Sequence, residues 1–192
     1  VGSGILAHGL DQGNIALSVL CVSFATMGTL CALIFAFGSI SAHFNPIVTL
    51  VCAFRREIPR AHVLPYICIQ IAGAIAGVAI TNLMFGLPAL QISYTTRSGP
   101  GIWLGEFIAT FGLIGIILGC GKSNPAATPI AVPLYVAGAI FFTSSTCFAN
   151  PAVTIARVFT ATLTGIEPGS VGAFVVFQMI GAALACSLFS WL

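Results

Sequence analysis

The chain has 192 residues, of which 58% are apolar and only 5% are charged, and its net charge is +2. So few charged side chains cannot cover a water-facing globule of this size, so the composition excludes an ordinary soluble domain and predicts an integral, multi-pass membrane protein. The small net charge, without a basic run interleaved with aromatic residues, also excludes a nucleic-acid partner.

The first nine residues, VGSGILAHG, are apolar and lack the basic leader of a cleavable signal peptide. At 1.5 Å per residue they would form about 14 Å of helix, which is half of a bilayer. We expect them to be the end of a first span whose beginning precedes this chain.

Five longer apolar segments follow, separated by polar or Pro/Gly-rich joints. A helix that crosses the hydrocarbon core needs about 20 residues, and these segments come close to that length or exceed it. The predicted spans are Ile15 to Phe37, Val63 to Phe85, Ile102 to Gly119, Pro129 to about Thr143, and Val171 to Leu192.

Two shorter apolar segments, which begin at Asn45 and Asn150, run only about ten residues before a charge or a polar turn, and we expect half-spans there. They are near copies: HFNPIVTLVC at 43–52 and FANPAVTIAR at 148–157 share Asn-Pro, Val and Thr at a constant offset of 105. Likewise QIAGAIAG, which begins at Gln70, resembles QMIGAALA, which begins at Gln178.

This internal repeat predicts an inverted architecture. Each half holds three spans and one half-span, and because three is odd, consecutive halves enter the membrane in opposite orientations. We expect one channel domain over residues 1–192, with repeats of about 1–87 and 99–192. The side of the membrane whose joints hold more Lys and Arg is expected to be cytoplasmic. One side has four such residues, Arg55, Arg56, Arg60 and Lys122, and the other has two, Arg97 and Arg157, so we expect the first side to face the cytoplasm.

The Asn-Pro pair is itself a helix-start signal, because Asn is a favoured N-cap and Pro is favoured at the first helical position. Two ten-residue helices of about 15 Å each, placed end to end, match the hydrocarbon thickness, so their N-termini should meet near the midplane. Irregular backbone at that depth is tolerated beside a polar cavity, which predicts a conduit next to Asn45 and Asn150. The positive ends of the two helices would raise the barrier to cations in it.

No pattern indicates an enzyme, a cofactor or a metal site. The seven cysteines are single, without a CxxC pair or a histidine at metal-ligand spacing, and there is no HExxH motif. Small residues four apart instead predict close helix packing in lipid, at Gly73 and Gly77, Gly115 and Gly119, and Gly181 and Ala185.

These features together resemble the aquaporin family, the major intrinsic proteins. The motifs that carry the resemblance are SAHFNPIVTL, FANPAVTIAR, the Gly-rich spans with Gln70 and Gln178, and GEFIATFGL at 105–113. It implies an all-α, right-handed bundle of six transmembrane helices, the first only partly present, plus two re-entrant half-helices. It also implies a homotetramer in the cell membrane, surrounded by lipid, with one pore for water and neutral solutes in each subunit. The midplane residues would be Asn45, Pro46, Ile47, Asn150, Pro151 and Ala152, of which Ile47 narrows or dries the midplane.

At the selectivity filter the chain departs from the family pattern. The family usually has an arginine directly after the second Asn-Pro box, Asn150–Ala152, where this chain has Val153. The other matching positions are Gly138, Cys147 and Thr26, or Ala25 if the count starts from the first box. None is charged or aromatic, which predicts a wide, weakly polar filter. Such a filter would admit glycerol-like polyols, urea or metalloid hydroxides such as arsenous acid.

Three further residues receive roles by the resemblance or by their position. Glu106 matches the glutamate that holds the second re-entrant loop through its backbone, and His43 is a pore-wall or loop-bracing residue. Arg157 lies one turn beyond Val153 and either leans back to the constriction or extends to the vestibule, which we favour. The alternative function is a coupled secondary transporter, which also uses inverted repeats and would need Glu106 or His43 as a titratable group.

Overall fold

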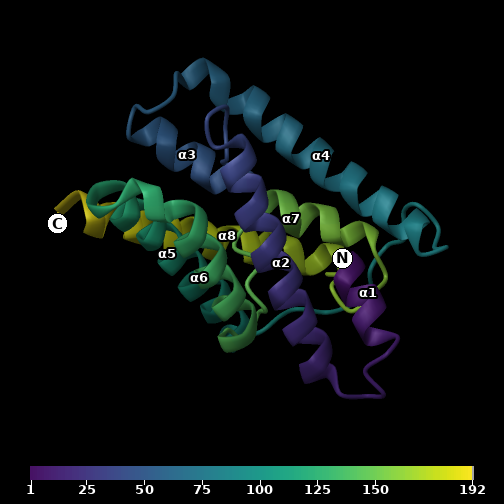
Figure 1. Ribbon diagram of the computed structural model, residues 1–192. Coiled ribbons are helices and arrows are strands. Elements are labelled where there is room, and N and C mark those ends of the chain that lie inside the picture. The colour runs from purple at the N-terminus through teal and green to yellow at the C-terminus, as the bar shows by residue number, and fades with distance from the viewer. Residues whose placement is uncertain (192) are drawn as a thin grey trace.

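The computed structural model describes residues 1–191, and their regular structure is entirely helical. The α-helices, shown in Figure 1, are α1 (Gly2–His8), α2 (Ile15–Phe37), α3 (Pro46–Phe54), α4 (Val63–Met84), α5 (Pro100–Ser123), α6 (Thr128–Phe142), α7 (Pro151–Ala156) and α8 (Pro168–Trp191). Short 3₁₀ turns precede α4 and α6 and follow α7: Arg60–His62, Pro125–Ala127 and Arg157–Phe159.

Five helical segments are long and apolar enough to cross a membrane: Ile15–Phe37, Arg60–Met84, Pro100–Ser123, Pro125–Phe142 and Pro168–Trp191. They correspond to the five predicted long spans, and the multi-pass membrane architecture is confirmed. The last predicted span ends at Leu192, which lies outside the described residues. Large apolar side chains such as Phe24, Ile69 and Met84 are 61–74% exposed, as expected for helices that face lipid.

The helix α5 begins earlier and ends later than the predicted span Ile102 to Gly119. Gly99 has a φ of +119°, which glycine adopts without strain, and Pro100 then occupies the first helical position. At the other end, the hydroxyl of Ser123 donates to the carbonyl of Gly119 at 2.8 Å. Pro100 and Gly101 at the start and Lys122 and Ser123 at the end therefore belong to the helix, which the apolar pattern could not show.

Close packing between α5 and α8 depends on the small residues that the sequence predicts. A methyl group added at Gly181 would lie 2.5 Å from the carbonyl oxygen of Phe107 and 3.1 Å from the backbone nitrogen of Phe111. Gly115 and Gly119 face the ring of Phe189. By contrast, a methyl group added at Gly73 or Gly77 on α4 would meet no atom of the described chain within 4 Å, apart from the helix backbone and the chain neighbours.

The half-helices α3 and α7 fill the space between α4 and α8, and each of them packs on both long helices. Figure 1 shows α3 and α7 on opposite sides of the centre of the bundle, with α2 crossing in front. The α-helical part of α7 has only six residues and passes into the 3₁₀ turn Arg157–Phe159. The carbonyls of that turn accept hydrogen bonds from the backbone of Gln91, Ser93 and Ile166, so neighbouring segments rather than a continued helix satisfy them.

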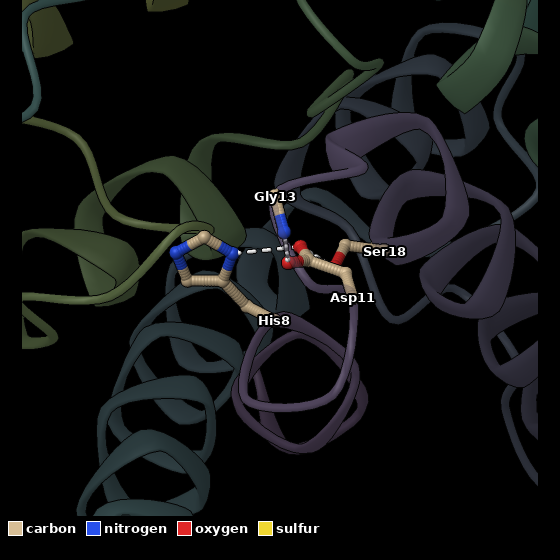
Figure 2. A network of polar contacts seen from close by, with 4 residues as sticks. All are labelled: His8, Asp11, Gly13 and Ser18. Atoms are coloured by element: carbon tan, nitrogen blue, oxygen red, sulfur yellow. Dashed lines mark hydrogen bonds and ion pairs between the residues drawn. The ribbon is translucent and has the colours of Figure 1, made fainter.

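The loop between α1 and α2 is organised around one carboxylate (Figure 2). Asp11 accepts the hydroxyl of Ser18 at 2.6 Å and the backbone N–H of Gly13 at 2.9 Å, and its oxygen lies 2.9 Å from Nδ1 of His8. Asp11 is only 5% exposed, and Figure 2 shows His8, Gly13 and Ser18 around its carboxylate. The hydrogen bonds from Ser18 and His8 lower the pKa of Asp11 to about 2.

Candidate functional site

Both half-helices begin with the cap that the Asn-Pro pair predicts. The side-chain oxygen of Asn45 accepts the backbone N–H of Ile47 at 2.9 Å, and that of Asn150 accepts from Ala152 at 3.0 Å and Val153 at 3.3 Å. Both caps have extended backbone, and proline follows at the first helical position. The local sequence is therefore sufficient to start a helix at each site.

The same two asparagines hold the half-helices together. The amide nitrogen of Asn45 donates to the carbonyl of Ala149 at 2.7 Å, and that of Asn150 donates to the carbonyl of Phe44 at 2.8 Å. Each asparagine thus uses its oxygen for its own helix and one N–H for the opposite loop. This reciprocal pair brings the N-termini of α3 and α7 side by side.

The residues before the caps have an unusual backbone that aims these carbonyls. Phe44 has a φ of +49° and Ala149 a φ of +45°, both left-handed, and they occupy matching positions in the repeat. This conformation costs roughly 1–2 kcal/mol for a residue with a side chain. It persists here because it turns the carbonyls of Phe44 and Ala149 toward the opposite asparagine amides.

A second pair of equivalent bonds ties each half-helix to a long helix. Nε2 of Gln70 on α4 donates to the hydroxyl of Thr49 at 2.9 Å, and Nε2 of Gln178 on α8 donates to the hydroxyl of Thr154 at 3.0 Å. Both threonine hydroxyls also contact the carbonyl of the capping asparagine four residues earlier. The repeat seen in the sequence therefore recurs as matching hydrogen bonds.

The carboxylate of Glu106 lies at the approach to the second box. It is fully buried and accepts the backbone N–H of Phe148 and of Ala149, each at 2.9 Å, one on each oxygen. Gln178 donates to the second oxygen at 2.6 Å. Charge-assisted bonds of this kind hold an irregular segment firmly, and they engage both oxygens of Glu106.

At the first box, His43 occupies a bracing position. Its Nδ1 lies 3.1 Å from the hydroxyl of Thr49, and its ring packs at a tilt against Tyr66 with centroids 5.4 Å apart. The ring thus joins the segment before Asn45 to the second turn of α3.

The structure corrects the expectation for Ile47. The sequence predicts that this side chain narrows or dries the midplane, yet it is 1% exposed and packs in an apolar cluster. The cluster is formed by α3, α5 and α8: Ile47, Val48, Val51, Ile114, Leu118, Ala182 and Ala185. The cap at Asn45 fixes the rotation of α3, and that rotation turns Ile47 into the helix interface. Pro46, Pro151 and Ala152 are buried as well.

The four predicted filter positions come from four different parts of the chain. Thr26 is half-buried, on the same face of α2 as the core residue Val22, whereas Ala25 is exposed. Cys147 is buried in one apolar cluster with Val22 and Ile140. Val22 lies one turn before Thr26 on α2, and Ile140 lies two residues after Gly138 on α6.

Of the remaining two filter positions, Val153 packs against the cluster of Phe148, Ile166 and Phe174. Gly138 is exposed on α6, and a methyl group added there would meet only the ring of Phe142, at 3.6 Å.

Arg157 does not extend away from the second box, contrary to the orientation that we favour from the sequence. Its guanidinium carbon lies 4.3 Å from the ring centroid of Phe148, so the side chain turns back along α7. The guanidinium carbon of Arg97 lies 5.1 Å from the same centroid.

Two residues at this site have no predicted role from the sequence. Arg97 donates to the carbonyls of Gly165 at 2.8 Å and Leu163 at 2.9 Å, and so joins the segment before α5 to the segment before α8. Asn82 is fully buried near the end of α4 and donates to the carbonyls of Ala89 and Phe159, both at 3.0 Å. A lone asparagine inside an apolar span was the available signal for Asn82. For Arg97 the sequence indicates only a side of the membrane.

Comparison with known proteins identifies relatives over the whole length. The model of the family described as "Major intrinsic protein" matches residues 1–146. The chain is 45% identical over 193 residues to the aquaglyceroporin AqpS of Rhizobium meliloti (strain 1021), an alignment that covers 100% of this chain and 82% of the relative. It is 28% identical over 210 residues to aquaporin Z of Bradyrhizobium diazoefficiens, covering 100% and 85%. It is also 28% identical over 214 residues to the probable aquaporin AqpM of Archaeoglobus fulgidus, covering 98% and 86%.

Proposed function

Because the chain belongs to the major intrinsic protein family, whose relatives here are aquaporins and an aquaglyceroporin, we propose that it is a passive transmembrane channel for water and small uncharged solutes. The observation that carries the proposal is the reciprocal bonding of Asn45 and Asn150. Each amide donates one N–H to the opposite loop, and within residues 1–191 its second N–H has no acceptor in the protein. Two unmatched donors at the junction of two helix N-termini are suited to the oxygen of a passing molecule.

Ion exclusion follows from the same junction. Each helix N-terminus carries about half a positive charge, and α3 and α7 meet there end to end. A cation or a proton at this point would be repelled by both partial charges. Water, glycerol and urea carry no net charge and would not be repelled.

The substrate class follows from the filter positions. Thr26, Gly138, Cys147 and Val153 offer neither a charge nor an aromatic ring, and we assign to them a wide, weakly polar constriction. Such a constriction passes polyols of the size of glycerol, urea and uncharged metalloid hydroxides such as arsenous acid along with water. The relative AqpS is called an aquaglyceroporin, which agrees with a pore wider than a water-only channel.

The contacts of Glu106 favour a channel over a coupled transporter. A transporter would need this buried carboxylate, or His43, to exchange a proton or bind an ion during each cycle. Both oxygens of Glu106 instead hold the backbone of Phe148 and Ala149. Protonation would break the loop that places Asn150, so we assign Glu106 a bracing role and no enzymatic or transport chemistry.

We assign residues 1–192 to a single channel domain made of two inverted repeats, and we infer a homotetramer in the cell membrane with one pore in each subunit. Family membership supports both inferences. Native mass measurement in detergent tests the assembly: a mass of four chains is expected, and a monodisperse monomer in several detergents would contradict it.

The filter assignment is tested by replacing Val153 with Arg and Gly138 with His in one variant. In stopped-flow light scattering on proteoliposomes, fluxes of glycerol and arsenous acid should fall about tenfold or more relative to water, because two bulky side chains narrow the constriction. Thr96→Arg is the control for added charge, since Thr96 is exposed in the segment before α5. Solute flux equal to that of the wild type in the double variant would show that the constriction lies elsewhere.

A further inference from the structure

Two guanidinium groups approach the ring of Phe148, which lies two residues before Asn150. Phe148 is 4% exposed and is held by two further contacts. Its backbone N–H donates to the carboxylate of Glu106, and its ring packs edge-on against Phe174 with centroids 5.1 Å apart. Phe148 is therefore a rigid platform for Arg97 and Arg157.

The two arginines differ in their hydrogen bonds. Arg97 donates from Nε and Nη2 to the carbonyls of Gly165 and Leu163, and Nη1 lies 3.5 Å from the hydroxyl of Thr146. Nε, Nη1 and Nη2 of Arg97 therefore all have acceptors within the protein. Arg157 makes no side-chain hydrogen bond and no ion pair with any residue of the described range, and its guanidinium packs on the ring of Phe148.

A guanidinium has five N–H donors, and placing one in a half-buried setting without acceptors is unfavourable. A second cation at the same ring adds repulsion. Packing on the ring of Phe148 offsets only part of this cost. The arrangement is explained if the unmatched donors of Arg157 face the conduit and meet oxygens that pass through it.

The direction of the side chain agrees with this. Arg157 lies one turn beyond Val153, and long side chains on a helix lean toward its N-terminus. The contact with Phe148 shows that Arg157 does so, which returns its guanidinium toward the segment that contains Cys147. The position directly after the second box, where Val153 stands, needs no arginine if one reaches back from the next turn.

We propose that Arg157 is a specificity-determining residue of the pore: from one turn beyond the usual position, it donates hydrogen bonds to the oxygens of neutral solutes and repels cations. Packing on the ring of Phe148 holds it in place. This inference rests on the proposed channel function and assigns a selecting group to its outer half, which the four small filter residues lack.

The test compares Arg157→Gln, Arg157→Lys and the exchange variant Val153→Arg/Arg157→Val in proteoliposomes. Water and glycerol fluxes are followed by stopped-flow light scattering, and proton leak by an internal pH dye under a valinomycin-clamped potential. Arg157→Gln should raise the proton leak at least about tenfold while water flux is retained, and Arg157→Lys should restore exclusion. Arg60→Gln, which removes an exposed charge at the opposite end of the fold, should leave the leak unchanged.

The exchange variant separates position from charge. It keeps one arginine but moves it one turn, about 6 Å, toward the box. Proton leak should stay low, while the ratio of glycerol to water flux should fall several-fold. A purely structural role predicts the opposite result: leak and solute ratio as in the wild type in every variant, with changes only in thermal stability, and this would overturn the inference. Absence of any water flux in the wild type would instead contradict the channel itself.

Discussion

At the scale of single residues, the site depends on side chains that satisfy irregular backbone. Glu106 is the strongest example, because its two oxygens accept the only N–H groups that Phe148 and Ala149 have. A carboxylate can do this without offering a competing donor, whereas an amide cannot.

Glu106→Gln should therefore destabilise the fold by about 2–3 kcal/mol, since one oxygen is replaced by a donor that faces a backbone N–H. Thermal unfolding in detergent, followed by circular dichroism, measures the effect. The control is Glu57→Gln, because Glu57 is exposed and forms a surface ion pair with Arg55. An equal effect of the two substitutions would argue against the bracing role of Glu106.

Asp11 provides a pH-dependent prediction at the same scale. Its pKa of about 2 in the folded protein is lower than the value of about 3.9 expected for an unfolded chain. Ionised Asp11 thus favours the folded state above about pH 4, and this contribution is lost as the pH falls toward about 2.

The difference in melting temperature between the wild type and Asp11→Asn should accordingly be largest at neutral pH. It should shrink between about pH 4 and pH 2, where the wild type also becomes protonated. A difference that stays constant over this range would show that the hydrogen bonds to Asp11 do not depend on its charge.

At the scale of elements, the bundle relies on one very close helix contact. Gly181 lets α8 approach the backbone of α5, and the carbonyl of Phe107 leaves no room for a side chain there. The contact also reaches the candidate site, because α5 supplies Glu106 and α8 supplies Gln178, which meet beside the second half-helix.

Gly181→Ala should therefore lower stability by about 1–3 kcal/mol, because the helices must separate to admit the methyl group. Gly172→Ala is a matched control on the same helix: Gly172 is exposed, and a methyl group added there would have no atom within 4 Å outside its own helix backbone and chain neighbours. It should melt at or slightly above the wild-type temperature. A Gly181→Ala protein as stable as this control would contradict the close approach.

At the scale of the whole molecule, the sequence predicts the architecture well because its main signals are local or repeated. Apolar length finds the spans, the Asn-Pro pair starts α3 and α7, and the repeat places Gln70 and Gln178 in equivalent spans. The long helix α2 begins and ends at the predicted residues.

The parts that sequence reasoning misses are those set by tertiary contacts. The burial of Ile47 depends on the rotation of α3 against α5 and α8, and the direction of Arg157 depends on the ring of Phe148. The role of Arg97 depends on carbonyls in an irregular segment almost seventy residues away, for which no periodic pattern exists.

We propose that the two half-helices joined at Asn45 and Asn150 border a passive conduit. The decisive experiment is the stopped-flow flux of glycerol into proteoliposomes that contain the purified protein, measured over a wide concentration range without an ion gradient. A channel predicts a flux that rises linearly with the glycerol gradient and does not change when a proton gradient is imposed. Flux that saturates and appears only with a proton gradient would contradict the account and favour a coupled transporter.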